Sequence, residues 1–269
     1  MPLIDKGRLL RGAVPVNNEN VNPVWRGNIV LDDGGRAVAF VKMLSKRDLA
    51  VECLCAVIGR EFGLPIPRPF LVTVQPDTLK GITLIKEEVL FGSERSASPD
   101  LAEHLSDETG IEVMAELYRW RKSFDLGIFD DWMANPDRHP RNLLYDGESK
   151  FTPIDHSHAI PRGIEAGQIL NNRILDALHG LSKEIGKPVK DQATRGRKSA
   201  KKITATNPLL KVAADLEREL DEYHNPAEMI AFLQERIGYL GGFVDTRYFS
   251  PKQQDLVNNV SSKPESTDA

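Results

Sequence analysis

Residues 130–142 (DDWMANPDRHPRN) and residues 153–158 (PIDHSH) hold the densest run of polar, chemically able side chains in the sequence. Pro136 and Pro140 prevent a continuous helix through the first stretch, because proline lacks a backbone N–H and clashes with the preceding turn. Asp137 to Asn142 is therefore predicted to form a loop.

This loop leads directly into two short strands, predicted at 142–145 and 151–154 around the turn at Asp146-Gly147. A hairpin of this length brings Asn142 close to Asp155, which follows the second strand. An amide oxygen and a carboxylate oxygen are hard ligands that suit Mg²⁺ with bound phosphates. The spacing therefore favours a metal and phosphate site at the base of the hairpin.

Asp137 precedes Asn142 by five residues. A carboxylate held there can orient a hydroxyl nucleophile and accept its proton. Two other interpretations stay open. Asp137 and Asn142 could form a local turn network that only caps the hairpin. His156 and His158, which we expect to point the same way, could hold Zn²⁺ with Asp137 and His139 in a hydrolase.

The composition indicates a folded protein with a substantial core. The 269 residues are 41% hydrophobic and 28% charged, with a net charge of −4, which excludes a uniformly basic nucleic-acid-binding surface. The two cysteines, Cys53 and Cys55, lie on a predicted helix and are expected to pack in the core without a disulfide. No apolar segment has the length of a membrane span or of a signal core, so we expect a soluble, cytoplasmic protein with no membrane partner.

The order of predicted elements is strands first and helices afterwards, which is typical of the α+β class. We expect a β-rich unit over residues 1–92 with one helix, a helical unit over 93–249, and a polar tail over 250–269. Strands are predicted at 24–31, 36–43, 70–74 and 82–90, and helices at 46–62, 100–106, 109–119, 122–134, 165–181, 207–223 and 226–240.

One segment, 182–202, is strongly basic: it holds eight Lys or Arg and two acidic residues. Its glycines, proline and low apolar content predict an exposed insertion between helices. It is either a solvated linker or a docking patch for an anionic partner, at Lys183 to Lys202. It has no aromatic residues between the charges, so sequence-specific binding to single strands is not indicated.

The string D-R-H-x-x-N at 137–142, followed by I-D-H at 154–156, resembles the catalytic and metal-binding loops of HipA-like kinases, and is similar to those of phosphatidylinositol-3/4-kinase-like enzymes. Upstream, Lys42 ends an apolar strand, Glu52 lies on the next helix, and G-L-P-I-P follows at 63–67. The same order recurs in HipA-like kinases. This resemblance implies a bilobal protein-kinase-like fold, with a small β-rich N-lobe and a larger helical C-lobe.

The resemblance also implies roles for individual residues in the C-lobe. Asp137 corresponds to the catalytic aspartate that contacts the acceptor hydroxyl. His139 can hydrogen-bond the transferring phosphate. Asn142 and Asp155 correspond to the two Mg²⁺ ligands.

In the N-lobe, the resemblance makes Lys42 the residue that holds the α- and β-phosphates of ATP. Glu52 is then the acid that positions it and keeps it charged. The adenine is expected against the connecting segment near 86–90, through Glu87, Glu88 and Val89.

The sequence departs from the protein-kinase pattern at three points. It has no G-x-G-x-x-G loop, and the candidate lid over the phosphates is the loose stretch Gly12 to Asn22. The order H-R-D is absent, because His139 follows Asp137. The metal-binding loop reads D-H-S at 155–157, so a phenylalanine-driven switch is not expected.

These observations predict an ATP- and Mg²⁺-dependent phosphotransferase whose acceptor is a protein serine or threonine. The resemblance implies a protein substrate and an antitoxin or regulatory partner. The alternatives are a nucleotide-binding pseudokinase that acts as a partner-binding module and the zinc-dependent hydrolase.

Overall fold

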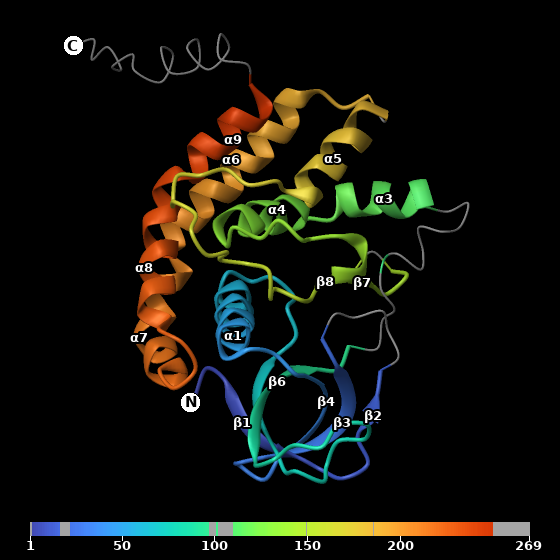
Figure 1. The fold of residues 1–269 in the computed structure, drawn as a ribbon. Helices are drawn as coiled ribbons and strands as arrows, with labels where there is room; N and C mark the ends of the chain where they lie inside the picture. Colours follow the sequence, from blue (N-terminus) through green and yellow to red (C-terminus); the bar gives the residue numbers. More distant parts are fainter. Residues whose placement is uncertain are drawn as a thin grey trace, which may run out of the picture.

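The computed structural model describes residues 2–16, 22–96, 101, 110–148, 150–184 and 186–249. A β-rich N-terminal part precedes a helical C-terminal part (Figure 1). The predicted α+β class is therefore confirmed.

The N-terminal part is one sheet of six strands in the order β1-β5-β6-β4-β3-β2. Because β1 also pairs with β3, the sheet closes on itself. All of its strand pairs are antiparallel except β1 with β5. The strands are β1 Asp5–Leu9, β2 Val14–Pro15, β3 Val24–Leu31, β4 Arg36–Lys42, β5 Pro69–Val74 and β6 Glu88–Glu94.

A small apolar core fills the inside of this closed sheet, with Trp25, Ile29 and Val41 among its buried members. Side chains alternate between the two faces of a strand, so Lys42 points to the opposite face from Val41. The alternation of β4 thus directs Lys42 away from this core.

The helix α1 (Lys46–Glu61) lies between the sheet and the helical part (Figure 1). Ser45 caps it by accepting a hydrogen bond from the backbone N–H of Asp48 at 3.1 Å. Every residue from 49 to 59 is buried, as expected of a helix that is covered on all sides. Cys53 and Cys55 are buried and unbonded, which confirms their predicted packing role.

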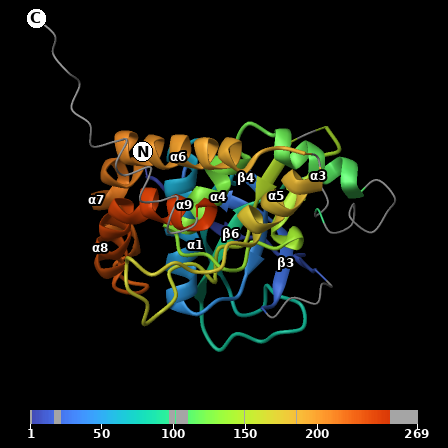
Figure 2. The same cartoon turned by 90° about the horizontal axis from the view of Figure 1, so that it is seen from above.

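The helical part includes a short hairpin, which lies on the side facing the sheet (Figure 1), and it shares one large apolar core with α1. Its helices and strands are α3 Gly110–Arg119, α4 Ser123–Trp132, η1 Pro140–Asn142, β7 Leu143–Tyr145, β8 Phe151–Pro153, α5 Arg173–Glu184, α6 Val189–Thr206, α7 Pro208–Leu220, α8 Pro226–Arg236, η2 Ile237–Tyr239 and α9 Leu240–Tyr248. Figure 2 shows α6 along one edge of this part.

The predicted strand at 82–90 begins too early. Residues 82–87 are irregular and β6 runs to Glu94, so the β-rich part extends past the predicted boundary at residue 92. The strands β1 and β2 had no counterpart in the prediction, because they are short and lack a strong apolar alternation.

The helix predicted at 165–181 begins only at Arg173. The basic segment 182–202 was expected to be an exposed insertion, and most of it is instead the helix α6. The error arose because α6 packs through small residues such as Gly196 and Ala200, which contribute little to mean hydropathy. The predicted helix at 100–106 (Leu101 apart), the tail at 250–269 and residues 17–21 of the candidate lid lie outside the described residues.

None of the helices in the described part of the chain is long and apolar enough to cross a membrane.

Candidate active site

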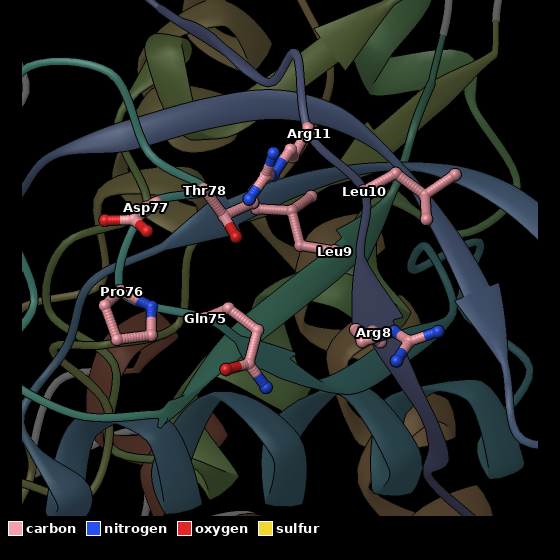
Figure 3. A pocket seen from close by; sticks show the side chains of 8 residues that line it. All are labelled: Arg8, Leu9, Leu10, Arg11, Gln75, Pro76, Asp77 and Thr78. Atoms are coloured by element: carbon pink, nitrogen blue, oxygen red, sulfur yellow. The ribbon is translucent and has the colours of Figure 1, made fainter.

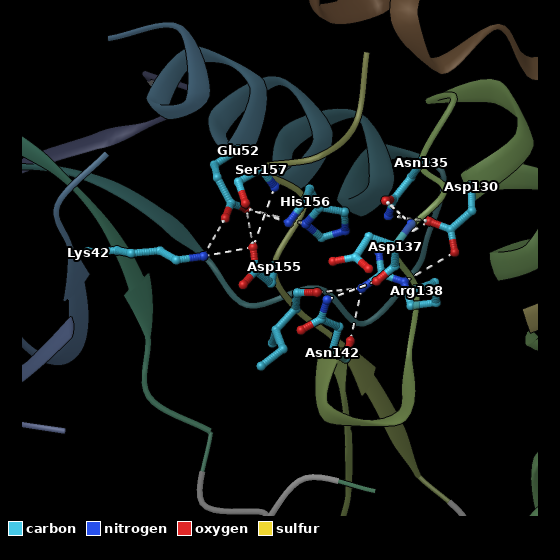
Figure 4. A network of polar contacts seen from close by, with 11 residues as sticks. Lys42, Glu52, Asp130, Asn135, Asp137, Arg138, Asn142, Asp155, His156 and Ser157 are labelled. Atoms are coloured by element: carbon cyan, nitrogen blue, oxygen red, sulfur yellow. Dashed lines mark hydrogen bonds and ion pairs between the residues drawn. The ribbon is translucent and has the colours of Figure 1, made fainter. Parts of the chain in front are cut away.

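A buried ion pair between Arg138 and Asp130 fixes the loop that follows α4 (Figure 4). Arg138 donates through Nε and Nη2 to the two carboxylate oxygens of Asp130, each at 3.1 Å. Its Nη1 donates to the carbonyl of Asn142 at 2.9 Å and to the carbonyl of Ile154. One buried guanidinium therefore ties α4, the loop and the end of the hairpin together.

Two asparagines shape the loop itself. Asn135 accepts from the backbone N–H of Asp137 at 3.1 Å, and its amide donates to Asp130 at 3.1 Å. The amide of Asn142 donates to the carbonyl of Asp137 at 2.9 Å. These bonds fix the backbone of Asp137 on both sides and leave its carboxylate directed outward, with 28% of the side chain exposed.

Three cationic or ionisable groups surround the Asp137 carboxylate without forming short hydrogen bonds to it. His139 Nε2 lies at 3.7 Å, Arg173 Nη1 at 3.6 Å and His158 Nε2 at 4.0 Å. Arg173 begins α5, far from the loop in sequence, and no local pattern marked it. The structure thus adds Arg173 to the neighbourhood predicted for Asp137 and His139, and His158, which the zinc interpretation grouped with them, also lies near Asp137.

The second polar group joins the β-rich part to the hairpin. Lys42 Nζ lies 2.7 Å from Asp155 Oδ1 and 3.3 Å from Glu52 Oε1. These three residues come from β4, from α1 and from the loop after β8 (Figure 4). The predicted Lys42–Glu52 pair is therefore present, and Asp155 joins it.

Electrostatics keep Lys42 and Asp155 charged. Burial alone would lower the pKa of Lys42, but the carboxylates of Glu52 and Asp155 outweigh it and hold the pKa above its ordinary value. Burial would likewise raise the pKa of Asp155, yet the charge and hydrogen bond of Lys42, with the Ser157 hydroxyl, hold it well below its ordinary value.

Glu52 also fixes the loop that carries Asp155. Its second oxygen, Oε2, accepts from the backbone N–H of His156 at 2.9 Å, and the imidazole Nδ1 lies 3.6 Å away. Asp155 adopts φ +54°, a left-handed conformation, so the strand alternation ends there. His156 is consequently buried beside Glu52 while His158 is exposed beside Asp137.

This geometry contradicts the zinc arrangement considered above, in which His156 and His158 point the same way. Within the described residues, no group of three or more His, Cys, Asp or Glu side chains could hold a metal ion. The hairpin does bring Asn142 to the loop of Asp155. Leu143 pairs with Pro153, and the N–H of Ile154 donates to the carbonyl of Asn142 at 3.0 Å.

The three residues predicted to contact adenine lie elsewhere. Glu88 and Val89 begin β6, where they pair with Val74 and Thr73 of β5, and Glu87 accepts a hydrogen bond from Gln75. The chain leaves the sheet for the helical part at the other end of β6, after Glu94. The structure therefore does not bring Glu87, Glu88 and Val89 to the connecting segment, because the predicted strand ended several residues too early.

A surface hollow also lies outside this polar group. It is formed by the end of β1 and the turn after β5, and Figure 3 shows its lining. Its charged residues, Arg8, Arg11 and Asp77, are exposed, and none belongs to the site around Lys42 and Asp137.

A lysine between two carboxylates, an asparagine near the loop of Asp155 and a partly exposed aspartate are residue types that phosphoryl-transfer sites use. Comparison with known proteins agrees. The sequence profile described as HipA-like kinase matches residues 32–219. The chain therefore belongs to the HipA-like kinase family and is a kinase-type phosphotransferase.

A solved structure with a similar fold is the Helicobacter pylori proinflammatory kinase CtkA. The TM-score is 0.51 at 10% sequence identity, over 83% of this chain and 94% of that one. No curated protein matches the sequence.

Proposed function

We propose that this protein is an ATP- and Mg²⁺-dependent kinase with a bilobal protein-kinase-like arrangement, and that it phosphorylates serine or threonine hydroxyls of a protein. The observation that carries the proposal is the position of Lys42 Nζ, 3.3 Å from Glu52 and 2.7 Å from Asp155. This contact links the β-rich part to the loop that follows the hairpin.

Lys42 is suited to hold the non-transferred phosphates. An ammonium is a compact positive charge with three donors, and the pKa of Lys42 lies above its ordinary value. Glu52 fixes the ammonium from the other side and is itself held by the backbone of His156. Lys42 then exchanges part of its contact with Asp155 for phosphate oxygens when the nucleotide binds.

The donor set of Asn142 and Asp155 fits Mg²⁺. Both supply hard oxygen ligands, and the low pKa of Asp155 keeps it ionised at any physiological pH. The amide nitrogen of Asn142 is committed to Asp137, which leaves the amide oxygen as the ligand atom. When bound, the metal ion neutralises phosphate charge during transfer.

Asp137 is placed to orient the acceptor hydroxyl and to receive its proton. Its carboxylate is partly exposed, while its backbone is fixed by Asn135 and Asn142. Arg173 and His139 lie close enough to attract the transferred phosphoryl group. Proton transfer of this kind contributes about 10²–10⁴-fold in rate.

The adenine is placed near the end of β6 and the segment that follows, from Ser93 to Ser96, rather than at Glu87 to Val89. Lys42 pairs with Phe91 in register, so the strand runs from this pair toward Ser93 and then leaves the sheet. The choice of a protein acceptor rests on the family. The regulatory or antitoxin partner that the family implies stays a prediction.

The test is label transfer from γ-labelled ATP with Mg²⁺, to the protein itself and to a cell lysate. We expect transfer by the wild type and none by Asp137→Ala or Asp155→Ala. Asp176→Ala, an exposed aspartate on α5, is the matched control and should transfer normally.

Two results would contradict the proposal. ATP binding without transfer to any acceptor would identify a pseudokinase. Transfer to lipid or small-molecule hydroxyls, with no labelled protein, would retain the kinase and refute the protein acceptor.

A further inference from the structure

Most of the basic segment 182–202, which begins in the last turn of α5, lies on the packed helix α6. In α6 the buried residues Gln192, Gly196 and Ile203 follow helical spacing, and the helix packs against α4 and α9. A Cβ on Gly196 would lie 3.2 Å from Val244 of α9, so the two helices approach closely there. The apolar side of α6 is therefore buried against α4 and α9.

The structure divides the eight basic residues of this segment into two groups. Three have intramolecular partners. The guanidinium of Arg195 lies 4.1 Å from the centre of the Phe124 ring, Arg197 Nη2 lies 2.7 Å from Asp245, and Lys202 Nζ lies 2.8 Å from Asp125.

The other five are exposed lysines. Lys190, Lys198 and Lys201 follow helical spacing on α6, and Lys187 lies just before its first turn; these four are called here the α6 lysine face. Within the described part of the chain, none of these four ammonium groups has an ion pair closer than 4.0 Å. Lys190 to Lys201 spans about 17 Å of helix axis, over which one DNA strand carries about five phosphates. Asp191 is the acidic residue at the start of this face.

The residue types on this face favour a phosphate backbone over a protein or a membrane. The exposed positions of α6 carry lysine, threonine, alanine and the single aspartate Asp191, with no aromatic or large aliphatic side chain. Protein interfaces centre on such apolar anchors and are depleted in lysine. Membrane-surface helices insert an apolar face, which α6 has already buried. A phosphate backbone requires only positive charge.

We propose that the α6 lysine face binds the backbone of duplex DNA without reading its sequence. The helix α6 lies along one edge of the molecule (Figure 2). The wide major groove of B-DNA admits a helix, whereas the narrow major groove of duplex RNA does not. The chain as a whole carries a net charge of −4, whereas segment 182–202 holds eight Lys or Arg and two acidic residues, so positive charge is concentrated at this face. This function is separate from the kinase reaction.

The experiment measures fluorescence anisotropy of a labelled 20-base-pair duplex of arbitrary sequence, with the full chain and no ATP. The wild type should bind at 50 mM salt, and the affinity should fall with salt at a log–log slope of about −3 to −4, from about −0.9 for each phosphate contacted. The test variant is Lys190→Glu/Lys198→Glu/Lys201→Glu.

The control makes the same charge change on exposed lysines of the β-rich part: Lys6→Glu/Lys80→Glu/Lys86→Glu. We expect the test variant to lose affinity by more than about 100-fold, because three phosphate contacts disappear and repulsion replaces them. The control variant should lose less than about threefold, because charges beyond a Debye length are screened.

Equal losses in both variants would show that only net charge matters and would overturn the proposal. So would stronger binding to a polyglutamate peptide, to duplex RNA or to phosphatidylserine vesicles than to DNA. If the glutamate variant does not fold by circular dichroism, the corresponding triple Lys→Gln variant replaces it. It should reduce the salt slope by about 3.

Discussion

Asp130 and Asp137 lie on one stretch of chain, yet the structure treats their carboxylates in opposite ways. Asp130 is fully buried and receives three hydrogen bonds, two from Arg138 and one from Asn135. Asp137 is partly exposed, and the groups around it stand at 3.6–4.0 Å. The Asp130 carboxylate uses its oxygens to hold the loop in place. The Asp137 carboxylate keeps lone pairs available, so it can accept a proton or a hydrogen bond from a hydroxyl group.

The largest effect on stability is expected at the buried Asp130–Arg138 ion pair. Arg138→Met leaves the Asp130 charge buried without its partner, and breaking a buried pair in this way costs about 3–5 kcal/mol. We expect the free energy of unfolding to fall by this amount in urea denaturation. Unchanged stability would show that the Asp130–Arg138 pair does not hold the loop.

At the Asp137 carboxylate we expect a small effect on stability and a large effect on activity. Asp137→Asn should change stability by about 0.5 kcal/mol or less, as exposed substitutions do. Phosphoryl transfer should nevertheless slow by about 10²–10⁴-fold, because the amide cannot accept the proton. Single-turnover transfer and thermal unfolding, measured on the same sample, separate the two effects. If Asp137→Asn lost stability in proportion to activity, the role of Asp137 would be structural and not catalytic.

Between these extremes, Asp155 links structure and chemistry. Its pKa is lower in the folded protein than in the unfolded chain, so its contribution to stability is present above about pH 4 and is lost as the pH falls further. We expect the stability of the wild type to decline more steeply between about pH 5 and 2 than that of Asp155→Asn. Asp176→Asn is the control, and identical slopes for wild type and Asp155→Asn would exclude a strong Lys42–Asp155 contact.

The smallest effect is expected at Arg173, whose side chain is 51% exposed. Arg173→Ala should slow transfer by about fivefold or less, equivalent to about 1 kcal/mol or less, as expected for a solvent-screened charge. The loss should diminish at high salt, and Arg173→Lys should restore most of the rate. A loss that is the same at all salt concentrations would point to a steric role.

Much of the site could be predicted from the sequence because its residues lie in short motifs. Two prolines define the loop of Asp137, and a hairpin of fixed length brings Asn142 to the loop of Asp155. The pair of Lys42 and Glu52 is implied by the resemblance to HipA-like kinases, in which a strand lysine precedes a helix glutamate. Each of these contacts depends on local geometry.

The rest depends on packing between distant elements. Arg173 lies near Asp137 only because the start of α5 packs close to the loop of Asp137. No sequence motif around Arg173 predicts this contact. The segment of α6 resembled a linker because small residues, rather than large apolar ones, form its buried side. The strand predicted at 82–90 is observed at Glu88–Glu94, because its position depends on pairing with β4 and β5, so the connecting segment begins later in the chain than 86–90.

The most direct test of the account is phosphoryl transfer by Lys42→Met, measured beside its thermal stability and its affinity for ATP. Methionine keeps the length of the side chain but removes the charge that joins Glu52 to Asp155. The account predicts a folded protein whose affinity for Mg²⁺-ATP falls and whose transfer rate drops by at least about 100-fold, in the range for removal of one electrostatic contact to the reacting group. Transfer at the wild-type rate by folded Lys42→Met protein would contradict it.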